Sequence, residues 1–265
     1  MWALPPATQA VVGPHAQFGE DGILEDIFRD CASGCCAEVG AYDGLTGSAT
    51  LEFERKGWSC LLVEPNPDLL EQIRRNRGCA IDGRAASAQE GQATFYVADH
   101  VEQMSTLELN HRHHRWVREV GGELRETTVK TARLDTILED AGFARLDFVT
   151  IDVEGHELDV LEGLTLERFR PRVVIIEENV PHRRSDVAKH MALHRYVNFR
   201  RTGVNEWYAR EDDTDLINPV AVTRFRRERQ VLRTRETAMR LLAKYTPAAI
   251  KRMLYGIREL LRRSG

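Results

Sequence analysis

Short apolar runs and segments of helical spacing alternate along this chain from residue 35 onward. The runs 35–39 and 60–63 are mostly apolar and too short for helices, as buried strands are. Between them, the segment 48–57 places its apolar residues at helical intervals and closes on a glycine. This order of strand, glycine turn, helix and strand predicts an α/β fold.

The same patterns predict the remaining elements. Helical spacing marks 21–30, the segment that follows Asn66, and 134–142. The region 99–126 breaks all regular periodicity, and such insertions between core elements are where substrate-selecting lids tend to lie. The expected strands cover 79–85, 93–98, 146–151 and 172–176, followed by a terminal hairpin formed by 196–200 and 206–210.

Glycines and an acidic residue after the first two strands predict a nucleotide-type cofactor site. Gly40 and Gly44 let the backbone turn tightly and approach a ligand. Glu64 ends the second strand, where dinucleotide folds use an acidic side chain to accept hydrogen bonds from both ribose hydroxyls. A tight turn that binds no ligand is the alternative reading of this pattern.

The residues of the turn favour a cationic cofactor over a dinucleotide. Tyr42 stands where a pyrophosphate needs the closest backbone approach, and Asp43 adds a negative charge there. S-adenosylmethionine carries a sulfonium and a protonated amine, so Glu38 and Asp43 attract it. An NAD-dependent oxidoreductase would share the turn and Glu64, but the sequence lacks a recognisable hydride-transfer constellation.

Several strings of residues together resemble one enzyme family. They are Ala16-Gln17-Phe18-Gly19-Glu20-Asp21-Gly22, the turn Glu38 to Gly44, Gly57-Trp58 before Val63-Glu64-Pro65, and Ile151-Asp152-Val153-Glu154-Gly155-His156-Glu157 with Val160-Leu161-Glu162-Gly163. Over about residues 15–210 the chain is similar to the FkbM family of S-adenosylmethionine-dependent methyltransferases. The Asp-Val-Glu-Gly-His-Glu string is the most specific of these motifs, whereas the glycine turn is common.

The resemblance implies a fold and an activity. The fold is the Rossmann-like class I methyltransferase, a three-layer α/β/α architecture with a mostly parallel seven-stranded sheet and an antiparallel last strand. The activity is O-methylation, the transfer of a methyl group to a hydroxyl, often on a sugar or a polyketide.

Polar residues converge on one edge of the predicted sheet, where ligands bind in open α/β folds. An alcohol that attacks a methyl group gains from a base. His156 is the first candidate, and Asp152 and Glu154 are alternatives, acting as bases or as orienting partners of His156. The plainer reading is that Glu154 and His156 only cap and brace their loop.

Further contacts are assigned by order along the chain and by the resemblance. Asp82, Ala86 and Ser87 follow the third strand and are expected to contact adenine, and Asp152 borders the cofactor. The resemblance places Gln17 near the cofactor. On the acceptor side we expect these residues: Ser105, Thr106, Glu178, and His111 and His113 in a basic loop.

A divalent ion is an open alternative at the sheet edge. Asp152, Glu178 and Asn179 would supply three oxygen ligands at adjacent strand ends, which suits Mg²⁺. The histidines 111, 113 and 114 are predicted not to bind metal, because adjacent histidines do not easily face one ion.

Composition and charge divide the chain. Residues 224–265 hold 13 Lys and Arg against 3 Glu, while the rest holds 24 basic and 38 acidic residues. We therefore expect an N-terminal segment and helix over 1–34, a methyltransferase domain over 35–223 and a basic tail over 224–265. The 5 cysteines indicate a reducing compartment, and the sequence shows no secretion signal, so a cytoplasmic location is expected.

The tail predicts a basic amphipathic helix. Its apolar stripe runs from Ile250 to Leu261 and is flanked by Lys and Arg. Such a helix suits an anionic membrane surface, which would make the protein peripheral at the inner face, or a partner subunit. Nucleic acid is disfavoured, because aromatic residues are not interleaved with the charges. A non-catalytic, membrane-associated scaffold with the same fold is the non-enzymatic alternative.

Overall fold

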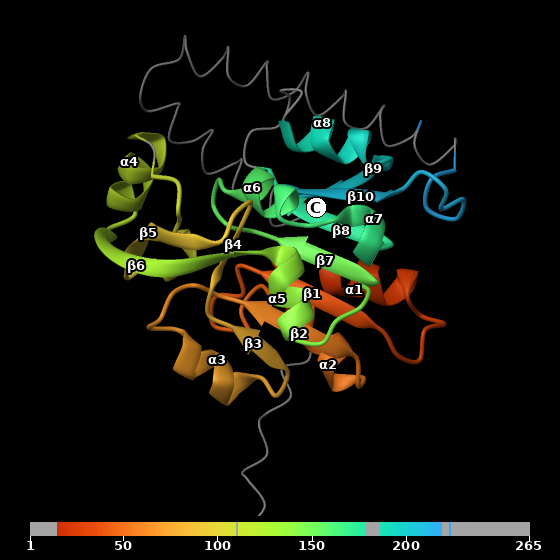
Figure 1. Ribbon diagram of the computed structural model, residues 1–265, viewed down its shortest axis with the longest axis horizontal. Helices are drawn as coiled ribbons and strands as arrows, with labels where there is room; N and C mark the ends of the chain where they lie inside the picture. Colours follow the sequence, from red (N-terminus) through yellow and green to blue (C-terminus); the bar gives the residue numbers. More distant parts are fainter. Residues whose placement is uncertain (1–14, 110, 179–185, 219–222, 224–265) are drawn as a thin grey trace, which may run out of the picture.

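The computed structural model describes residues 15–109, 111–178, 186–218 and 223. Its main sheet has seven strands, and a second sheet of three strands stands beside it (Figure 1). The strands of the main sheet, in spatial order, are β3 (Ala80–Asp82), β2 (Ser59–Val63), β1 (Cys35–Val39), β7 (Phe148–Ile151), β8 (Val173–Glu177), β10 (Asn205–Arg210) and β9 (Tyr196–Thr202).

The direction of the strands confirms the predicted sheet. β3, β2, β1, β7 and β8 pair in parallel, and β10 enters between β8 and β9 antiparallel to both. β10 follows β9 through the short turn that contains Gly203, so the predicted hairpin supplies the antiparallel strand. The fold is therefore the three-layer α/β class with a mostly parallel seven-stranded sheet.

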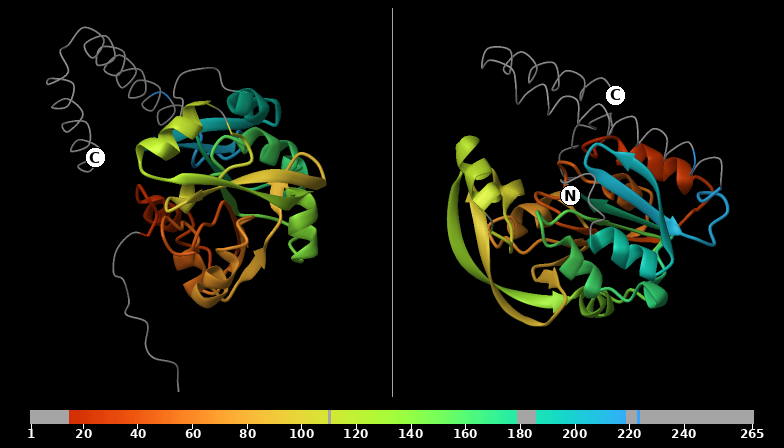
Figure 2. Two further views of the ribbon diagram at one scale, coloured as in Figure 1. Left: turned by 90° about the vertical axis from the view of Figure 1, so that its left-hand side faces the viewer. Right: turned by 90° about the horizontal axis from the view of Figure 1, so that it is seen from above.

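Alternate side chains of the central strands enter two different cores. Ala37 and Val39 of β1 pack in the core that holds α5 (Leu134–Asp140), α6 (Glu157–Glu162), α7 (Leu166–Phe169) and α8 (Asp186–Leu193). Cys36 faces the opposite core with Phe28 and Phe53, which lies with α1 (Glu20–Ile27), α2 (Leu51–Arg55) and α3 (Leu70–Asn76) on the other face. The view from above in Figure 2 shows these two layers on either side of the strands. Burial on both faces explains why these strands are continuous apolar runs.

A long hairpin forms an arm beside the main sheet. β5 (Gly91–Asp99) and β6 (Glu123–Arg133) pair antiparallel, and β4 (Ala85–Ser87) pairs with β6 in parallel. Between the two long strands lie the short helix η1 (Glu102–Met104) and α4 (His111–Glu119). In Figure 2 the arm curves away from the main sheet and carries α4.

The prediction that 99–126 is irregular was wrong. α4 lies inside that region, and β6 begins at Glu123 rather than near 127. The physical reason is weak patterning, because most of the described side chains at the start of β6 face solvent and Val117 is the buried side chain of α4. Elements with little buried surface lack the hydrophobic period on which such predictions depend.

The strand predicted over 79–85 was wrong, because residues 83–84 separate β3 from β4 and the two strands belong to different sheets. The other predicted elements are present with shifted ends. The largest shift is in α2, which begins three residues later than expected and ends two residues before Gly57. The five cysteines are free thiols. Among the helices of the described residues, none is long and apolar enough to cross a membrane. The predicted tail at 224–265 lies outside the described residues, and the division into three segments stays a prediction.

Candidate functional site

A cavity of about 610 Å³ opens at the carboxyl ends of the parallel strands. This volume is within the range of small-molecule sites. Its floor is formed by the ends of β1, β2, β7 and β8, and residues of the arm form the facing wall. The lining from the arm comprises Phe95, Val101, Glu102, Gln103, Met104, Ser105, Leu107 and Val120.

The turn after β1 can only be made with glycine at its first position. Gly40 has a φ of 87°, and its N–H donates to the Val63 carbonyl at 2.9 Å. A Cβ at this position would lie 1.7 Å from the carbonyl oxygen of Asp152, which is backbone and has no free rotamer. Gly40 therefore lets the ends of β1 and β7 approach closely and leaves space for a ligand above them.

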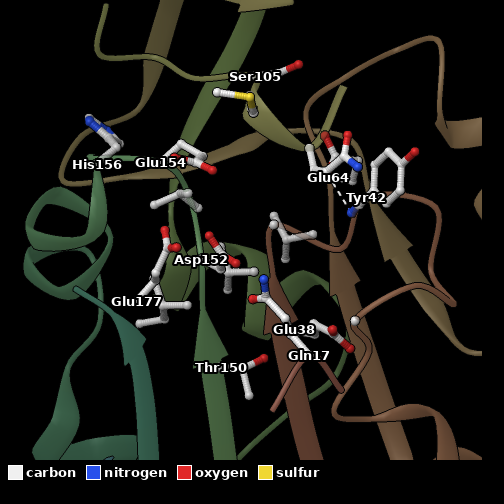
Figure 3. Close-up of a pocket in the computed structure, with 18 of the residues that line it drawn as sticks. Gln17, Glu38, Tyr42, Glu64, Ser105, Thr150, Asp152, Glu154, His156 and Glu177 are labelled. Atoms are coloured by element: carbon white, nitrogen blue, oxygen red, sulfur yellow. Dashed lines mark hydrogen bonds between the residues drawn. The ribbon is translucent and has the colours of Figure 1, made fainter. Parts of the chain in front are cut away.

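Glu64 is held rigidly at the end of β2. Its Oε2 accepts the N–H of Tyr42 at 2.9 Å, and its Oε1 accepts the N–H of Asn66 at 2.8 Å. Burial raises the pKa of Glu64 to about 7, opposed by these two N–H groups, and the charge of Asp152 raises it further. Figure 3 shows this carboxylate beside Tyr42 at the cavity wall. A carboxylate has about four acceptor positions, so two remain for a ligand.

Three carboxylates from separate segments meet on the cavity floor. Asp152 follows β7, Glu154 lies in the loop after it, and Glu177 ends β8, and one oxygen of each lies within 4.8 Å of the others. Burial and the charges of its two neighbours raise the pKa of Glu177 to about 11, and burial together with Asp152 raises that of Glu154 to about 8. The group, called here the acidic trio, therefore retains protons at neutral pH when no cation is bound.

Replacing Glu177 with glutamine is expected to flatten the pH dependence of stability. Because the folded-state pKa of Glu177 is raised above the ordinary 4.5, its proton stabilises the folded protein at low pH, and this contribution is lost as pH rises from about 4.5 toward 11. Glutamine carries no charge, so Glu177→Gln should gain roughly 1 kcal/mol or more relative to wild type between pH 5 and pH 9. Urea unfolding at both pH values measures this.

A matched control for this prediction is Glu71→Gln. Glu71 pairs with Arg75 on the exposed surface of α3, where charge is well solvated. Its removal should leave the pH dependence of unfolding close to that of wild type. Equal pH slopes for Glu177→Gln and wild type would contradict the assignment of the proton to the trio.

The loop after β7 is strained and held by the arm. Glu154 has a φ of 54°, in the left-handed region that disfavours residues with a side chain, and Gly155 has a φ of 111°. The hydroxyl of Thr106 donates to the Glu154 carbonyl at 3.0 Å. Backbone strain of this kind persists only where neighbouring contacts enforce it, and it gathers at functional sites.

His156 lies at the cavity edge with both ring nitrogens near side chains. Its Nε2 lies 3.0 Å from the hydroxyl of Ser87, and its Nδ1 lies 3.4 Å from a carboxylate oxygen of Asp159. In Figure 3 the ring stands apart from Asp152 and Glu177. The Ser87 hydroxyl is thus the hydrogen-bond partner of the imidazole, and Nδ1 has no hydrogen-bond partner among the described residues.

The charged residues of the cavity lining are almost all acidic. Among the described residues that line it there is no lysine or arginine, and its histidines are His15 and His156. Its acidic residues are Glu20, Glu38, Glu64, Glu102, Asp152, Glu154 and Glu177. Such a cavity attracts cations and repels a pyrophosphate.

Most of the predicted site residues line this cavity. Their placement shows that the sheet edge brings them together, and it leaves their individual roles as predictions. They are Gln17, Glu38, Gly40, Glu64, Ala86, Ser105, Asp152, Glu154 and His156.

Three other predicted contacts lie outside the lining and have partners within the protein, so their roles toward a ligand stay predictions. Asp82 accepts hydrogen bonds from Arg84, with which it forms an ion pair. Asp43 accepts the N–H groups of Leu45 and Thr46. The Gly44 carbonyl accepts from Arg77.

Ser87 and Thr106 are also outside the lining, since their hydroxyls contact His156 and the Glu154 carbonyl respectively. Both hydroxyls therefore contact the segment after β7, and their roles toward a ligand stay predictions. His111 and His113 fall in α4, and their side chains, like residue Asn179, lie outside the described part of the chain.

The strand-end acid of the lining is Glu177, which the sequence places at the sheet edge with residues 178–179 but which was not among the selected site residues. Glu178 was predicted, but it follows the strand and is absent from the lining, whereas Glu177 still belongs to β8 and lines the cavity with Ile175. Side chains of a strand alternate, so an error of one residue reverses the face. The metal prediction now rests on Asp152, Glu154 and Glu177, whose oxygens suit a hard divalent ion. It stays a prediction.

The topology and the cavity together define a Rossmann-like methyltransferase. The seven-stranded sheet has one antiparallel strand, the glycine turn follows β1, and acids end β2, β7 and β8 around an anionic cavity. The chain belongs to the FkbM methyltransferase family, because the family model described as "Methyltransferase FkbM domain" matches residues 38–201.

Relatives with assigned names are also methyltransferases. Methyltransferase 1 of Beauveria bassiana is 29% identical over 186 residues, which is 59% of this chain and 72% of that protein. The hexuronic acid methyltransferase AglP of Haloferax volcanii is 30% identical over 131 residues, 48% of this chain and 49% of that protein, so the match spans about half of AglP.

Among solved structures, the chain is similar to a precorrin-6y C5,15-methyltransferase from Geobacter metallireducens. The two share 13% identity and a TM-score of 0.39 over 71% of this chain and 85% of that chain. A likeness at that level carries no argument about the acceptor.

Proposed function

We propose that this methyltransferase uses S-adenosylmethionine to methylate a hydroxyl of a glycan or of another small-molecule acceptor. The observation that supports it best is the lining of the cavity, which has acids on every side and, among its described residues, no lysine or arginine. A sulfonium and an ammonium gain from that field, whereas the pyrophosphate of NAD would be repelled. The alternative of an NAD-dependent oxidoreductase is therefore disfavoured.

The residues present fit such a donor along the cavity. Glu64 has acceptor positions left for ribose hydroxyls, and Ala86 contributes a small apolar surface suited to adenine. Gln17 and Glu38 both line the cavity and offer polar contacts to an amino-acid end (Figure 3). When bound, the donor supplies an electrophilic methyl group.

The chain has to align the acceptor, exclude water and take one proton. The arm faces the strand ends and is placed to cover an acceptor above the floor. The acidic trio provides carboxylates that can take up a proton, and burial together with Asp152 raises the pKa of Glu154 to about 8, closer to neutrality than that of Glu177. We therefore propose Glu154 ahead of Asp152 and His156 as the base, because the ring of His156 is engaged by Ser87.

Replacing Glu64 with glutamine is expected to weaken binding of S-adenosylhomocysteine about tenfold, because a neutral amide presents one oxygen where two were available. Isothermal titration calorimetry measures the dissociation constant. Glu71→Gln is the matched control, since it makes the same chemical change on the exposed surface of α3, where Glu71 pairs with Arg75 outside the lining. Unchanged binding by Glu64→Gln would contradict the ribose role, and a wild type that does not bind would reject the proposed function.

The acceptor class rests on a relative and on the resemblance. AglP is named for methylation of a hexuronic acid, which favours a sugar acceptor over a polyketide. Transfer of labelled methyl from S-adenosylmethionine into an extract of the native organism, followed by release of monosaccharides, identifies the product. Label in a methyl ether of a sugar supports the proposal, and label only in protein or in sugar-free metabolites rejects the glycan.

We also propose that the basic tail at 224–265 holds the enzyme on an anionic cytoplasmic membrane surface. Its support is the charge pattern of the sequence alone. Co-sedimentation of the full chain with vesicles containing anionic lipid, compared with a chain that lacks the tail, tests it. Loss of sedimentation on deletion is expected. A full chain that stays in solution favours a partner subunit instead, and membrane binding without methyl transfer favours the scaffold alternative.

A further inference from the structure

A buried arginine lies beneath the glycine turn. Arg77 follows α3, and its side chain is 0% exposed. Its Nε donates to Glu54, and its Nη1 donates to the Gly44 carbonyl at 2.8 Å. Gly44 has a φ of 78°, and a Cβ there would lie 3.0 Å from Arg77 Cγ. This arginine therefore joins α2, α3 and the turn.

The same guanidinium also contacts two hydroxyls. Nη1 donates to Ser48 Oγ and Nη2 donates to Thr50 Oγ1, each at 3.0 Å. Both hydroxyls donate in turn to Oε2 of Glu38, that of Ser48 at 2.7 Å. Ser48 and Thr50 are buried, so these bonds do not compete with water.

The chemistry of the groups fixes the direction of every bond. Arginine is always a donor, so each hydroxyl must accept from Arg77 and has its single proton left for Glu38. Both donated hydrogen bonds, together with the nearby charge of Arg77, stabilise the charged form of Glu38 and oppose the effect of burial. The network therefore favours the ionised carboxylate, although burial raises the pKa of Glu38 above its usual value.

Within this network one negative charge has no positive partner, and one hydrogen-bond acceptor position of Glu38 has no donor. Glu38 and Glu54 carry two charges against the single charge of Arg77. Ser48, Thr50 and the Ala49 N–H occupy three of the roughly four acceptor positions of the Glu38 carboxylate. Glu38 is 7% exposed, and that exposure lies on the cavity wall near Gln17 (Figure 3).

We infer that Arg77 is a positioning residue for the methyl donor. Through Ser48 and Thr50 it holds Glu38 ionised and aimed at the cavity, so that the carboxylate binds the ammonium of the donor's amino-acid end. This inference rests on the proposed function.

The test compares two ligands that differ only in whether they carry the amino-acid end of the donor. S-adenosylhomocysteine and 5′-methylthioadenosine share the adenosine and the sulfur, but the second lacks the amino-acid group. The variant Ser48→Ala with Thr50→Val removes the two hydroxyls and retains Arg77. Calorimetry of the full chain should show roughly 10- to 100-fold weaker binding of S-adenosylhomocysteine, and a change below about threefold for 5′-methylthioadenosine.

A loss of fold would weaken both ligands, so the difference between them separates positioning from a structural role. Thr136→Val is the matched control, because Thr136 also donates its hydroxyl to a carboxylate, that of Glu90, but outside the cavity lining. It should leave both affinities unchanged. Arg77→Met is the weaker probe, since it also leaves Glu54 without its counter-charge.

The energetic coupling between Glu38 and the two hydroxyls of Ser48 and Thr50 gives a second measurement. Glu38→Gln should weaken S-adenosylhomocysteine to a similar extent, and the Ser48 and Thr50 substitutions should add little in that background. Additive losses, equal losses for both ligands, or a wild type that binds the two ligands equally would overturn the inference. A wild type that binds neither would instead reject the proposed function.

Discussion

Gly40→Ala is expected to destabilise the protein by about 3 kcal/mol or more and to abolish measurable binding of S-adenosylhomocysteine. The new Cβ would lie 1.7 Å from the Asp152 carbonyl oxygen, and the backbone has a φ of 87°. The clash is relieved only if β1 and β7 separate, and that separation breaks the hydrogen bond from the Asp152 N–H to the Val39 carbonyl. Urea unfolding and calorimetric titration measure the two effects.

Gly57→Ala isolates the contribution of the backbone angle. Gly57 has a φ of 85°, nearly that of Gly40, but a Cβ there meets nothing within 4 Å. Its substitution should cost only about 1–2 kcal/mol, the penalty of a left-handed conformation, and should leave ligand binding intact. Equal destabilisation by the two substitutions would show that the clash with Asp152 is not the reason why residue 40 must be glycine.

The fold was largely predictable because its central strands are buried on both faces. Short apolar runs such as 35–39 and 173–176 are typical of strands in a sheet that is covered on both faces. The glycines that follow the first run mark a turn. The arm was not predictable on the same basis. The first half of β6 buries little apolar surface, so its structure depends on pairing with β5, which no local pattern reveals.

The site was predictable where a residue follows a strand directly and less so elsewhere. Glu64 and Asp152 end or follow buried strands, and both line the cavity as expected. At the end of β8 the selected residue was Glu178, one position beyond Glu177, and a difference of one residue reverses the side of the sheet. Arg77 could not be found from the sequence, because its partners at Ser48, Thr50 and Glu54 are brought to it only by the packing of α2 and α3.

Glu154→Gln is expected to lower methyl transfer at least 100-fold while binding of S-adenosylhomocysteine changes little. A base must be ionised, and in the ligand-free site burial and the charges of Asp152 and Glu157 raise the pKa of Glu154 to about 8. Wild-type activity should therefore rise as pH increases toward 8, and the variant should lose that rise. A cationic donor at the site lowers this pKa, which brings the base closer to neutrality.

His156→Ala is the variant that decides between the two candidate bases. His156 contacts Ser87 and Asp159 rather than the acidic trio, so its removal should lower activity modestly and leave the pH profile in place. Methyl transfer is followed with labelled S-adenosylmethionine and the extract of the native organism, with ligand binding verified for each variant. A near-normal Glu154→Gln beside an inactive His156→Ala would move the base to the imidazole. In that case the raised pKa of Glu154 would reflect the cost of an empty anionic cavity, and its role would be to attract the cationic donor.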